Sequence, residues 1–234
     1  MQVKPLTLAD IDAVIFDLDG VLTRTARLHA RAWKATFDPF LEPRSQAPFD
    51  IQSDYRRYVD GRPRGDGIRG FLAARYVTPT EDEVRSLGER KNALFLEYLA
   101  ADGVEVFQSS ITVARAVRNR GIKTAVVSAS RNCVAVLRAA GLAELFDAKV
   151  DGLDLARLGL AGKPAPDVFL RATQELGVAP ARAAVVEDAL AGVEAGRRGG
   201  FAVVIGIDRA GQAEALREHG ATLVVRDLAE LSLA

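Results

Sequence analysis

Short apolar runs recur along the chain without the polar alternation of a half-exposed strand. Strands that are covered on both faces read as such runs, because neither row of side chains meets water. The runs are AVIF at 13–16, KTAVVS at 123–128, AAVVE at 183–187 and FAVVIGI at 201–207, with a weaker ATLVV at 221–225. We therefore expect a buried strand at each of these places.

Helical patterns fill the intervals between the later runs. Ile111, Ala114 and Val117 recur every three residues before Gly121, which suits the end of a helix. Strand and helix then alternate from about residue 103 to the C terminus. This alternation predicts an α/β fold with a doubly wound, mostly parallel, Rossmann-like sheet, which binds its ligands at the carboxyl ends of the strands.

Residues 23–102 follow a different pattern. Helix-like segments at 25–37 and 81–101 flank a middle that is rich in proline, glycine, aspartate and aromatic residues, and this composition suits loops between short helices. The region contains no convincing strand. We therefore expect a small helical cap at 23–102, inserted after the first strand into a core formed by 1–22 and 103–234. The alternative is that these residues continue a single domain.

Composition narrows the class of protein. The 234 residues are 49% hydrophobic, enough for a packed core, and 31 basic residues match 31 acidic ones, so we expect no general attraction to nucleic acid or to an anionic membrane. Cys133 is the only cysteine, which excludes an internal disulfide and fits a reducing compartment. No apolar segment has the length of a signal peptide or a membrane span. We expect a cytoplasmic monomer that binds a small molecule.

Two aspartates end the first apolar run. Asp17 and Asp19, followed by Gly20, stand two apart, so in extended backbone their side chains point to the same side. Two bare carboxylates at a strand end repel each other, and Mg²⁺ removes that conflict while bridging to a phosphate. The sequence thus suggests a site for a metal and an oxyanion. The alternative is a surface turn with Asx-type hydrogen bonds.

Polar residues also follow the later runs. Ser128 closes the second run, Lys163 precedes two prolines in GKPAPD, and Glu187 and Asp188 close the AAVVE run. A hydroxyl, a cation and two acids near the carboxyl ends of neighbouring strands can meet at one site. Adjacent acids point apart if the strand continues through both. One of the pair would then bind at the site directly, and the other would reach it through a turn or a water. Taken singly, Ser128 fits a helix N-cap and Lys163 a solvated lysine just as well.

The set resembles the haloacid dehalogenase superfamily of phosphotransferases. DLDGV, VVSAS, GKPAPD and VVEDALAG occur in that family's order. The resemblance implies an enzyme in which Asp17 is the nucleophile that forms an aspartyl-phosphate and Asp19 is the general acid and base. It also implies that the phosphoryl oxygens are held by Ser128 and Lys163. The implied Mg²⁺ ligands are Asp17, Asp19 through its carbonyl oxygen, Glu187 and Asp188.

Segments of the insert resemble one branch of that superfamily, the β-phosphoglucomutases. They are TRTARLHARAWK, GRPRGDGIRGFL, ERKNALFLEYL and SASRNCVAVL. The chain departs from the pattern at Gly67 and in the more aromatic stretch 37–58, both where the sugar would be recognised. The likeness implies that Thr25, His29 and Trp33 line the hinge and the cap, that Arg64 and Lys91 hold the second, non-reacting phosphate, and that Ala129, Ser130 and Asn132 accompany the transferring one.

The likeness also implies a reaction. It is the Mg²⁺-dependent interconversion of β-D-glucose 1-phosphate and glucose 6-phosphate through an aspartyl-phosphate and a sugar bisphosphate, with glucose 1,6-bisphosphate as the activating phosphoryl donor. Closure of the cap would exclude water from the aspartyl-phosphate. One alternative is a sugar-phosphate phosphatase that uses the same aspartate with water as the acceptor. Another is a non-catalytic sugar-phosphate sensor, against which the intact set of catalytic residue types argues.

Overall fold

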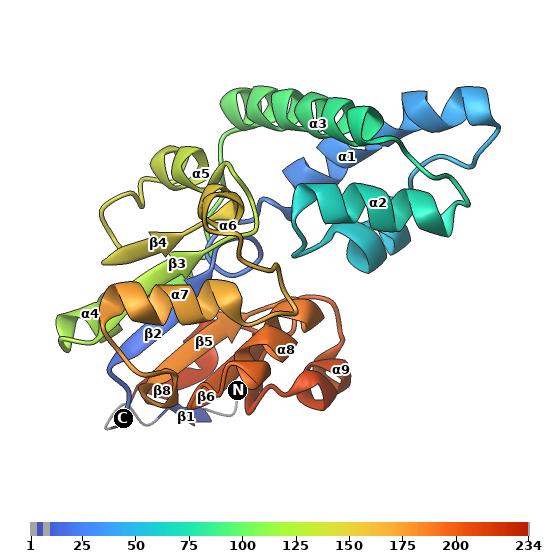
Figure 1. Cartoon of the computed structure of the whole chain (residues 1–234). Helices are drawn as coiled ribbons and strands as arrows, with labels where there is room; N and C mark the ends of the chain where they lie inside the picture. The colour runs from blue at the N-terminus through green and yellow to red at the C-terminus, as the bar shows by residue number, and fades with distance from the viewer. Residues whose placement is uncertain (1–3, 7–9, 234) are drawn as a thin grey trace. The chain divides into compact units, whose positions relative to one another are not determined.

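The computed structural model describes residues 4–6 and 10–233, which fall into two compact units (Figure 1). The first unit is built from the two ends of the chain, up to Arg24 and from Glu105 onwards, and the second runs from Thr25 to Val104. Each unit has a hydrophobic core of its own. Within 25–104, all of which the structure describes, there are helices and turns but no strand.

A six-stranded sheet forms the centre of the first unit. Its strands are β2 (Ala13–Asp17), β3 (Lys123–Val127), β4 (Ala148–Val150), β5 (Ala183–Glu187), β6 (Val203–Ile207) and β7 (Leu223–Val225). They lie in the order β4-β3-β2-β5-β6-β7, and every neighbouring pair is parallel. The predicted doubly wound α/β fold is confirmed, and β2 lies in the middle of the sheet between β3 and β5.

Helices cover the sheet. They are α4 (Gln108–Asn119), α5 (Cys133–Ala139), α6 (Gly152–Leu158), α7 (Asp167–Leu176), α8 (Leu190–Arg198) and α9 (Ala213–His219). Figure 1 shows α7 and α8 in front of the sheet, where Phe169 and Val193 join Ile15 and Val185 in one core. Phe16 points to the opposite face by strand alternation and is also fully buried. Both faces are therefore covered, which explains why the strand runs lack polar positions.

Three short strands lie outside the predicted set. Strand β4 has only three residues, and Lys149 in its middle interrupts the apolar pattern. Strands β1 (Lys4–Leu6) and β8 (Leu231–Leu233) pair with each other in a separate parallel sheet. The five predicted runs all contain a strand, including the weaker run at 221–225. Strand β7 also has only three residues, but it lies within a longer apolar run, whereas β1, β4 and β8 do not.

The second unit is helical. Its helices are α1 (Ala26–Leu41), α2 (Arg64–Ala74) and α3 (Glu81–Asp102), with a 3-10 turn at Glu42–Arg44 and a π-helical turn at Tyr55–Val59. The predicted end of the first helix near Phe37 is wrong, because α1 continues through Pro39 to Leu41. Phe37 and Leu41 are fully buried, and this packing offsets the hydrogen bond that proline removes. None of the helices in the described ranges combines the length and the apolar composition that crossing a bilayer needs.

The aromatic residues of the second unit form its core. The Phe37 ring centroid lies 5.3 Å from that of Phe49 and 4.4 Å from that of Phe71, and all three side chains are fully buried or nearly so. Gly67 lies in α2, where a Cβ would be 3.1 Å from Val59 Cγ1. These four residues therefore serve close packing within the unit, and the expectation that the departures from the family pattern concern the sugar stays a prediction.

Candidate active site

The carboxyl ends of β2, β3 and β5 bring polar residues to one edge of the sheet. Asp17 is the last residue of β2, Glu187 is the last residue of β5, and Ser128 directly follows β3. Because β2 lies between β3 and β5, these ends are adjacent. The Ser128 hydroxyl donates a hydrogen bond to Asp19 Oδ2 at 3.2 Å and so joins the turn after β2 to the end of β3. Asp17 is buried, so the alternative of a surface turn is wrong.

Lys163 lies between two of these carboxylates. Its ammonium donates hydrogen bonds to Asp17 Oδ1 and to Glu187 Oε1, and the three residues are only 5%, 7% and 1% exposed in that order. Burial raises the pKa of Asp17 well above its ordinary value. The positive charge of Lys163 lowers this pKa, but by less than burial raises it. Burial alone would lower the pKa of Lys163, but the charges of Asp17 and Glu187 raise it, so the amine stays protonated. The alternative of a solvated lysine is wrong.

Three carboxylates form a candidate metal site. One oxygen from each of Asp17, Glu187 and Asp188 lies within 4.8 Å of the others. A set of carboxylate oxygens is the donor chemistry that Mg²⁺ prefers. Two glycines make room for the site, because a Cβ at Gly20 would strike the Asp188 carboxylate and a Cβ at Gly192 would strike that of Glu187. The residues present therefore fit a hard divalent cation.

The two adjacent acids both reach this site, and Asp188 does so through a turn, one of the two routes expected from the sequence. Adjacent side chains would point apart in a continuing strand, but β5 ends at Glu187 and the chain turns there. Glu187 Oε2 accepts hydrogen bonds from the backbone N–H groups of Asp188 and Ala189, both at 2.8 Å, so the turn closes around this carboxylate. Asp19 lies outside the three-carboxylate cluster, since its side chain accepts from Ser128. That its carbonyl oxygen is a metal ligand stays a prediction.

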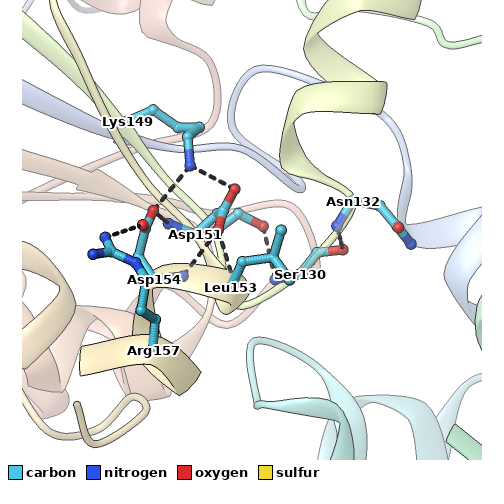
Figure 2. A network of polar contacts seen from close by, with 8 residues as sticks. Ser130, Asn132, Lys149, Asp151, Leu153, Asp154 and Arg157 are labelled. Atoms are coloured by element: carbon cyan, nitrogen blue, oxygen red, sulfur yellow. Dashed lines mark hydrogen bonds and ion pairs between the residues drawn. The ribbon is translucent and has the colours of Figure 1, made fainter. Parts of the chain in front are cut away.

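The residues predicted to bind the transferring phosphoryl group lie in the loop Ser128–Asn132, directly after β3. The Ser130 N–H donates to Ser128 Oγ at 3.1 Å. The Asn132 N–H donates to Ser130 Oγ at 3.2 Å, as Figure 2 shows. Ser128 is fully buried, and it is not an N-cap, because α5 begins only at Cys133. Ala129 lies between the two serines in this loop. Cys133 is fully buried and is the first residue of α5.

In the second unit, α1 and α3 bring His29 and Lys91 together. Lys91 Nζ lies 2.6 Å from His29 Nδ1. A protonated lysine would donate in this contact, and His29 Nδ1 would accept. The His29 ring stacks on Phe95 at a centroid distance of 4.2 Å, and Lys91 Nζ lies 5.2 Å from the Trp33 ring centroid. Thr25 directly precedes α1 and is fully buried. The hinge and cap roles of these residues stay predictions.

Arg64 is the first residue of α2 and does not lie in a loop. Its guanidinium donates to the carbonyl oxygen of Gly88 at 3.0 Å and to Asn92 Oδ1 at 2.8 Å, both on α3. Its neighbours Arg57 and Arg62 are exposed, whereas Arg64 is half-buried. A generic solvated basic loop, which a stretch so rich in arginine could also indicate, therefore fits those neighbours but does not fit Arg64. Its predicted phosphate role stays a prediction.

Two further residues near this edge of the sheet were not predicted from the sequence. Arg209, two residues after β6, donates to the carbonyl oxygen of Gly20 at 3.0 Å, and its guanidinium lies 3.6 Å from the Phe107 ring centroid. Asp151 directly follows β4 and is fully buried. The position of Arg209 after a predicted strand was an available signal. Asp151 gave none, because Lys149 interrupts the apolar pattern of β4, so that no run marks this strand.

Comparisons with known proteins agree on one family. A family model for haloacid dehalogenase-like hydrolases matches residues 11–200. A β-phosphoglucomutase of Mycobacterium bovis is 49% identical over 94% of this chain and 91% of that relative, and a phosphorylated carbohydrates phosphatase of Thermotoga maritima is 28% identical over 92% and 94%. A crystal structure of a β-phosphoglucomutase from Clostridium difficile matches with a TM-score of 0.81 at 26% identity, over 95% of this chain and 93% of that one. The chain therefore belongs to the haloacid dehalogenase-like hydrolase family and is an enzyme.

Proposed function

We propose that this enzyme is a Mg²⁺-dependent phosphoglucomutase that interconverts β-D-glucose 1-phosphate and glucose 6-phosphate. One observation carries the proposal: Asp17 and Lys163 form a buried pair beside the three-carboxylate cluster. A nucleophile, a fixed cation and a metal site are thereby combined at one edge of the sheet. The 49% identity to the β-phosphoglucomutase of Mycobacterium bovis supports this choice of reaction.

Asp17 is proposed as the nucleophile. One of its carboxylate oxygens attacks phosphorus, and the bond between phosphorus and the sugar oxygen breaks, which leaves an aspartyl-phosphate. A carboxylate can approach a phosphate dianion only when much of the negative charge is neutralised. Lys163 supplies a permanent positive charge in contact with Asp17, in a buried place where that charge acts strongly.

Asp19 is proposed to move the proton. It would give a proton to the leaving sugar oxygen when Asp17 is phosphorylated, and it would take one from the sugar hydroxyl that accepts the phosphoryl group in the second step. The hydrogen bond from Ser128 to Asp19 Oδ2 fixes the direction of this carboxylate. Ser128 would thus orient the acid as well as bind the phosphoryl group.

Mg²⁺ would be held by Asp17, Glu187 and Asp188, with the Asp19 carbonyl oxygen proposed as a further ligand. When bound, it supplies positive charge at the transferring phosphoryl group. The oxygen-only donor set and the space left by Gly20 and Gly192 support this assignment.

A mutase needs a second cationic group, because its bisphosphate intermediate has two dianionic ends. Arg64 and Lys91 are proposed to bind the end that does not react, and glucose 1,6-bisphosphate is proposed as the activating donor. The two hydrogen bonds from Arg64 to α3 fix the direction of its guanidinium in advance, which lowers the entropy lost on binding.

The direct test is a paired assay. Purified protein is given Mg²⁺, β-D-glucose 1-phosphate and a trace of glucose 1,6-bisphosphate, while glucose 6-phosphate is followed through a coupled dehydrogenase and free phosphate by a colour reaction. Glucose 6-phosphate well ahead of free phosphate supports the mutase. An excess of free phosphate contradicts the mutase and supports a phosphatase. If neither product forms, the sugar is wrong.

Arg64→Ala separates the two reactions. We expect a fall of about tenfold or more in kcat/KM for the mutase reaction, because a lost charge-assisted hydrogen bond to phosphate costs this much. Release of phosphate from a monoester should change far less. The matched control is Arg69→Ala, which removes an exposed arginine of the same helix that pairs with Glu81. Equal losses in both reactions would contradict the assignment of Arg64 to the second phosphate.

The second candidate is a sugar-phosphate phosphatase with the same nucleophile. The similarity to the phosphorylated carbohydrates phosphatase of Thermotoga maritima, at 28% identity, supports this second candidate. It would transfer the phosphoryl group from Asp17 to water, so Asp19 would take its proton from water in place of a sugar hydroxyl. The paired assay decides between the two reactions.

A further inference from the structure

The loop Ser128–Asn132 is bonded to the segment in which β4 ends and α6 begins. The Ser128 N–H donates to the carbonyl oxygen of Val150 at 3.0 Å, and the Gly152 N–H donates to the carbonyl oxygen of Ser130 at 3.1 Å. The loop is therefore held at two points by backbone groups of Val150 and Gly152, which are only two residues apart in the chain. Any movement of the segment from Val150 to Gly152 moves the loop with it.

Gly152 makes this contact close. A Cβ at this position would lie 2.5 Å from the carbonyl oxygen of Ala129 and 3.0 Å from the backbone nitrogen of Arg131. Both neighbours are backbone atoms of the loop, which cannot swing aside as a side chain does. Glycine is thus required here by the approach of two backbones. A methyl group would have to displace the loop.

Asp151 fixes the position of Gly152. This fully buried residue is the N-cap of α6, and its Oδ1 accepts from the N–H groups of Leu153 and Asp154, at 2.8 and 3.2 Å. Asp154 Oδ2 accepts in return from the Asp151 N–H at 3.1 Å. Figure 2 shows Lys149 bonded to both acids, with Nζ 2.6 Å from Asp151 Oδ2 and 2.9 Å from Asp154 Oδ2. One half-buried cation therefore joins the two carboxylates of the cap.

Asp154 and Lys149 are both charged at neutral pH. Burial alone would raise the pKa of Asp154, but the hydrogen bonds from Lys149 and Arg157 lower it to about 2. Burial alone would lower the pKa of Lys149, but its hydrogen bonds to Asp151 and Asp154 raise it above its ordinary value. The ion pair between Lys149 and Asp154 is thus present in an ordinary assay buffer.

We propose that Asp151 and Gly152, held by Lys149 and Asp154, are positioning residues that set the phosphate-binding loop Ser128–Asn132 at its working distance from Asp17. The proposal rests on the proposed function in one respect, namely that this loop binds the transferring phosphoryl group. None of the four residues is required to touch the phosphate. They act through the backbone of the loop.

The test measures phosphate binding, which needs no sugar acceptor. The dissociation constants of inorganic phosphate in the presence of Mg²⁺, and of Mg²⁺ alone, are measured by calorimetry for Gly152→Ala and Lys149→Met. We expect the phosphate constant to rise about tenfold or more in Gly152→Ala and severalfold in Lys149→Met, because small displacements of positioning groups are costly. The Mg²⁺ constant should change less than about twofold, because its carboxylates lie at the ends of β2 and β5 and directly after β5, away from β4 and α6.

Matched variants separate positioning from loss of stability. Arg157→Met removes the other cation on Asp154, leaves Asp151 untouched and should bind phosphate normally. Gly70→Ala, where a Cβ meets no atom closer than 4.0 Å, controls for the glycine substitution, and Lys149→Arg should restore phosphate affinity. Normal phosphate binding by both test variants would overturn the proposal even if their thermal midpoints fall. So would equal weakening of phosphate and Mg²⁺.

The outcome also separates this proposal from the proposed function. If the wild type binds phosphate and the variants do not, but glucose 6-phosphate never forms, the loop is positioned as proposed and only the mutase assignment fails. If the wild type itself fails to bind phosphate with Mg²⁺, both fail. Should Gly152→Ala not fold, the comparison of Lys149→Met with Lys149→Arg and Arg157→Met decides alone.

Discussion

Asp17→Asn is expected to abolish turnover while leaving the fold intact. An amide oxygen is a poor nucleophile, so no covalent phosphoryl intermediate forms, and kcat should fall by about 10⁴-fold or more, as it does when other enzymes lose their nucleophile. The thermal midpoint should shift by no more than about 3 °C. The reason is that Lys163 keeps Glu187 as its buried partner, while the carboxylate that is removed is one that burial already disfavours.

The control for this variant lies on the same strand region. Asp12→Asn removes an exposed carboxylate just before β2, at the end of the strand away from the site, where it pairs with Arg182. We expect normal kcat for this control. Steady-state assays and thermal unfolding of both variants give the comparison. Turnover retained by Asp17→Asn, in protein free of wild-type contamination, would remove the basis of the aspartyl-phosphate mechanism.

The sequence predicts the sheet and its carboxyl edge because these depend on local patterns. Buried strands must be apolar on both faces, so β2, β3, β5, β6 and β7 are visible as runs, and polar residues at their ends stand out. The position of Lys163 between Asp17 and Glu187 was not predictable. It depends on where a loop returns across the sheet, which no periodicity records.

Other features of the chain are decided by packing. Pro39 predicts the end of a helix, but the burial of Phe37 and Leu41 keeps α1 intact beyond it. Asp188 turns into the carboxylate cluster only because β5 stops one residue earlier, which a strand prediction with uncertain ends does not fix. Nothing in the sequence around Gly152 marks it as important. Glycine is needed there because the backbone of another loop approaches it closely. Sequence thus predicts the chemistry at strand ends better than the contacts that hold it in place.

Lys163→Met is expected to damage both catalysis and stability. Methionine keeps most of the length of lysine but removes the ammonium, so Asp17 and Glu187 become two buried carboxylates without their shared cation. Removing one partner from a buried ion pair costs about 3–5 kcal/mol in the free energy of unfolding. Loss of a fixed charge at the transferring phosphoryl group should lower kcat by about 10²- to 10³-fold. Denaturant unfolding and steady-state kinetics measure the two losses.

The effect of Mg²⁺ on the thermal midpoint is the more specific test of Lys163→Met. A divalent cation on Asp17, Glu187 and Asp188 would neutralise the charge that the missing ammonium leaves exposed, so Mg²⁺ should raise the thermal midpoint of Lys163→Met more than that of the wild type. Lys123→Met is the matched control. It removes a lysine at the opposite end of β3 that donates to the carbonyl oxygen of Leu176, and both its kcat and its response to Mg²⁺ should equal those of the wild type. A stable Lys163→Met protein with an unchanged response to Mg²⁺ would mean that the lysine does not balance these carboxylates.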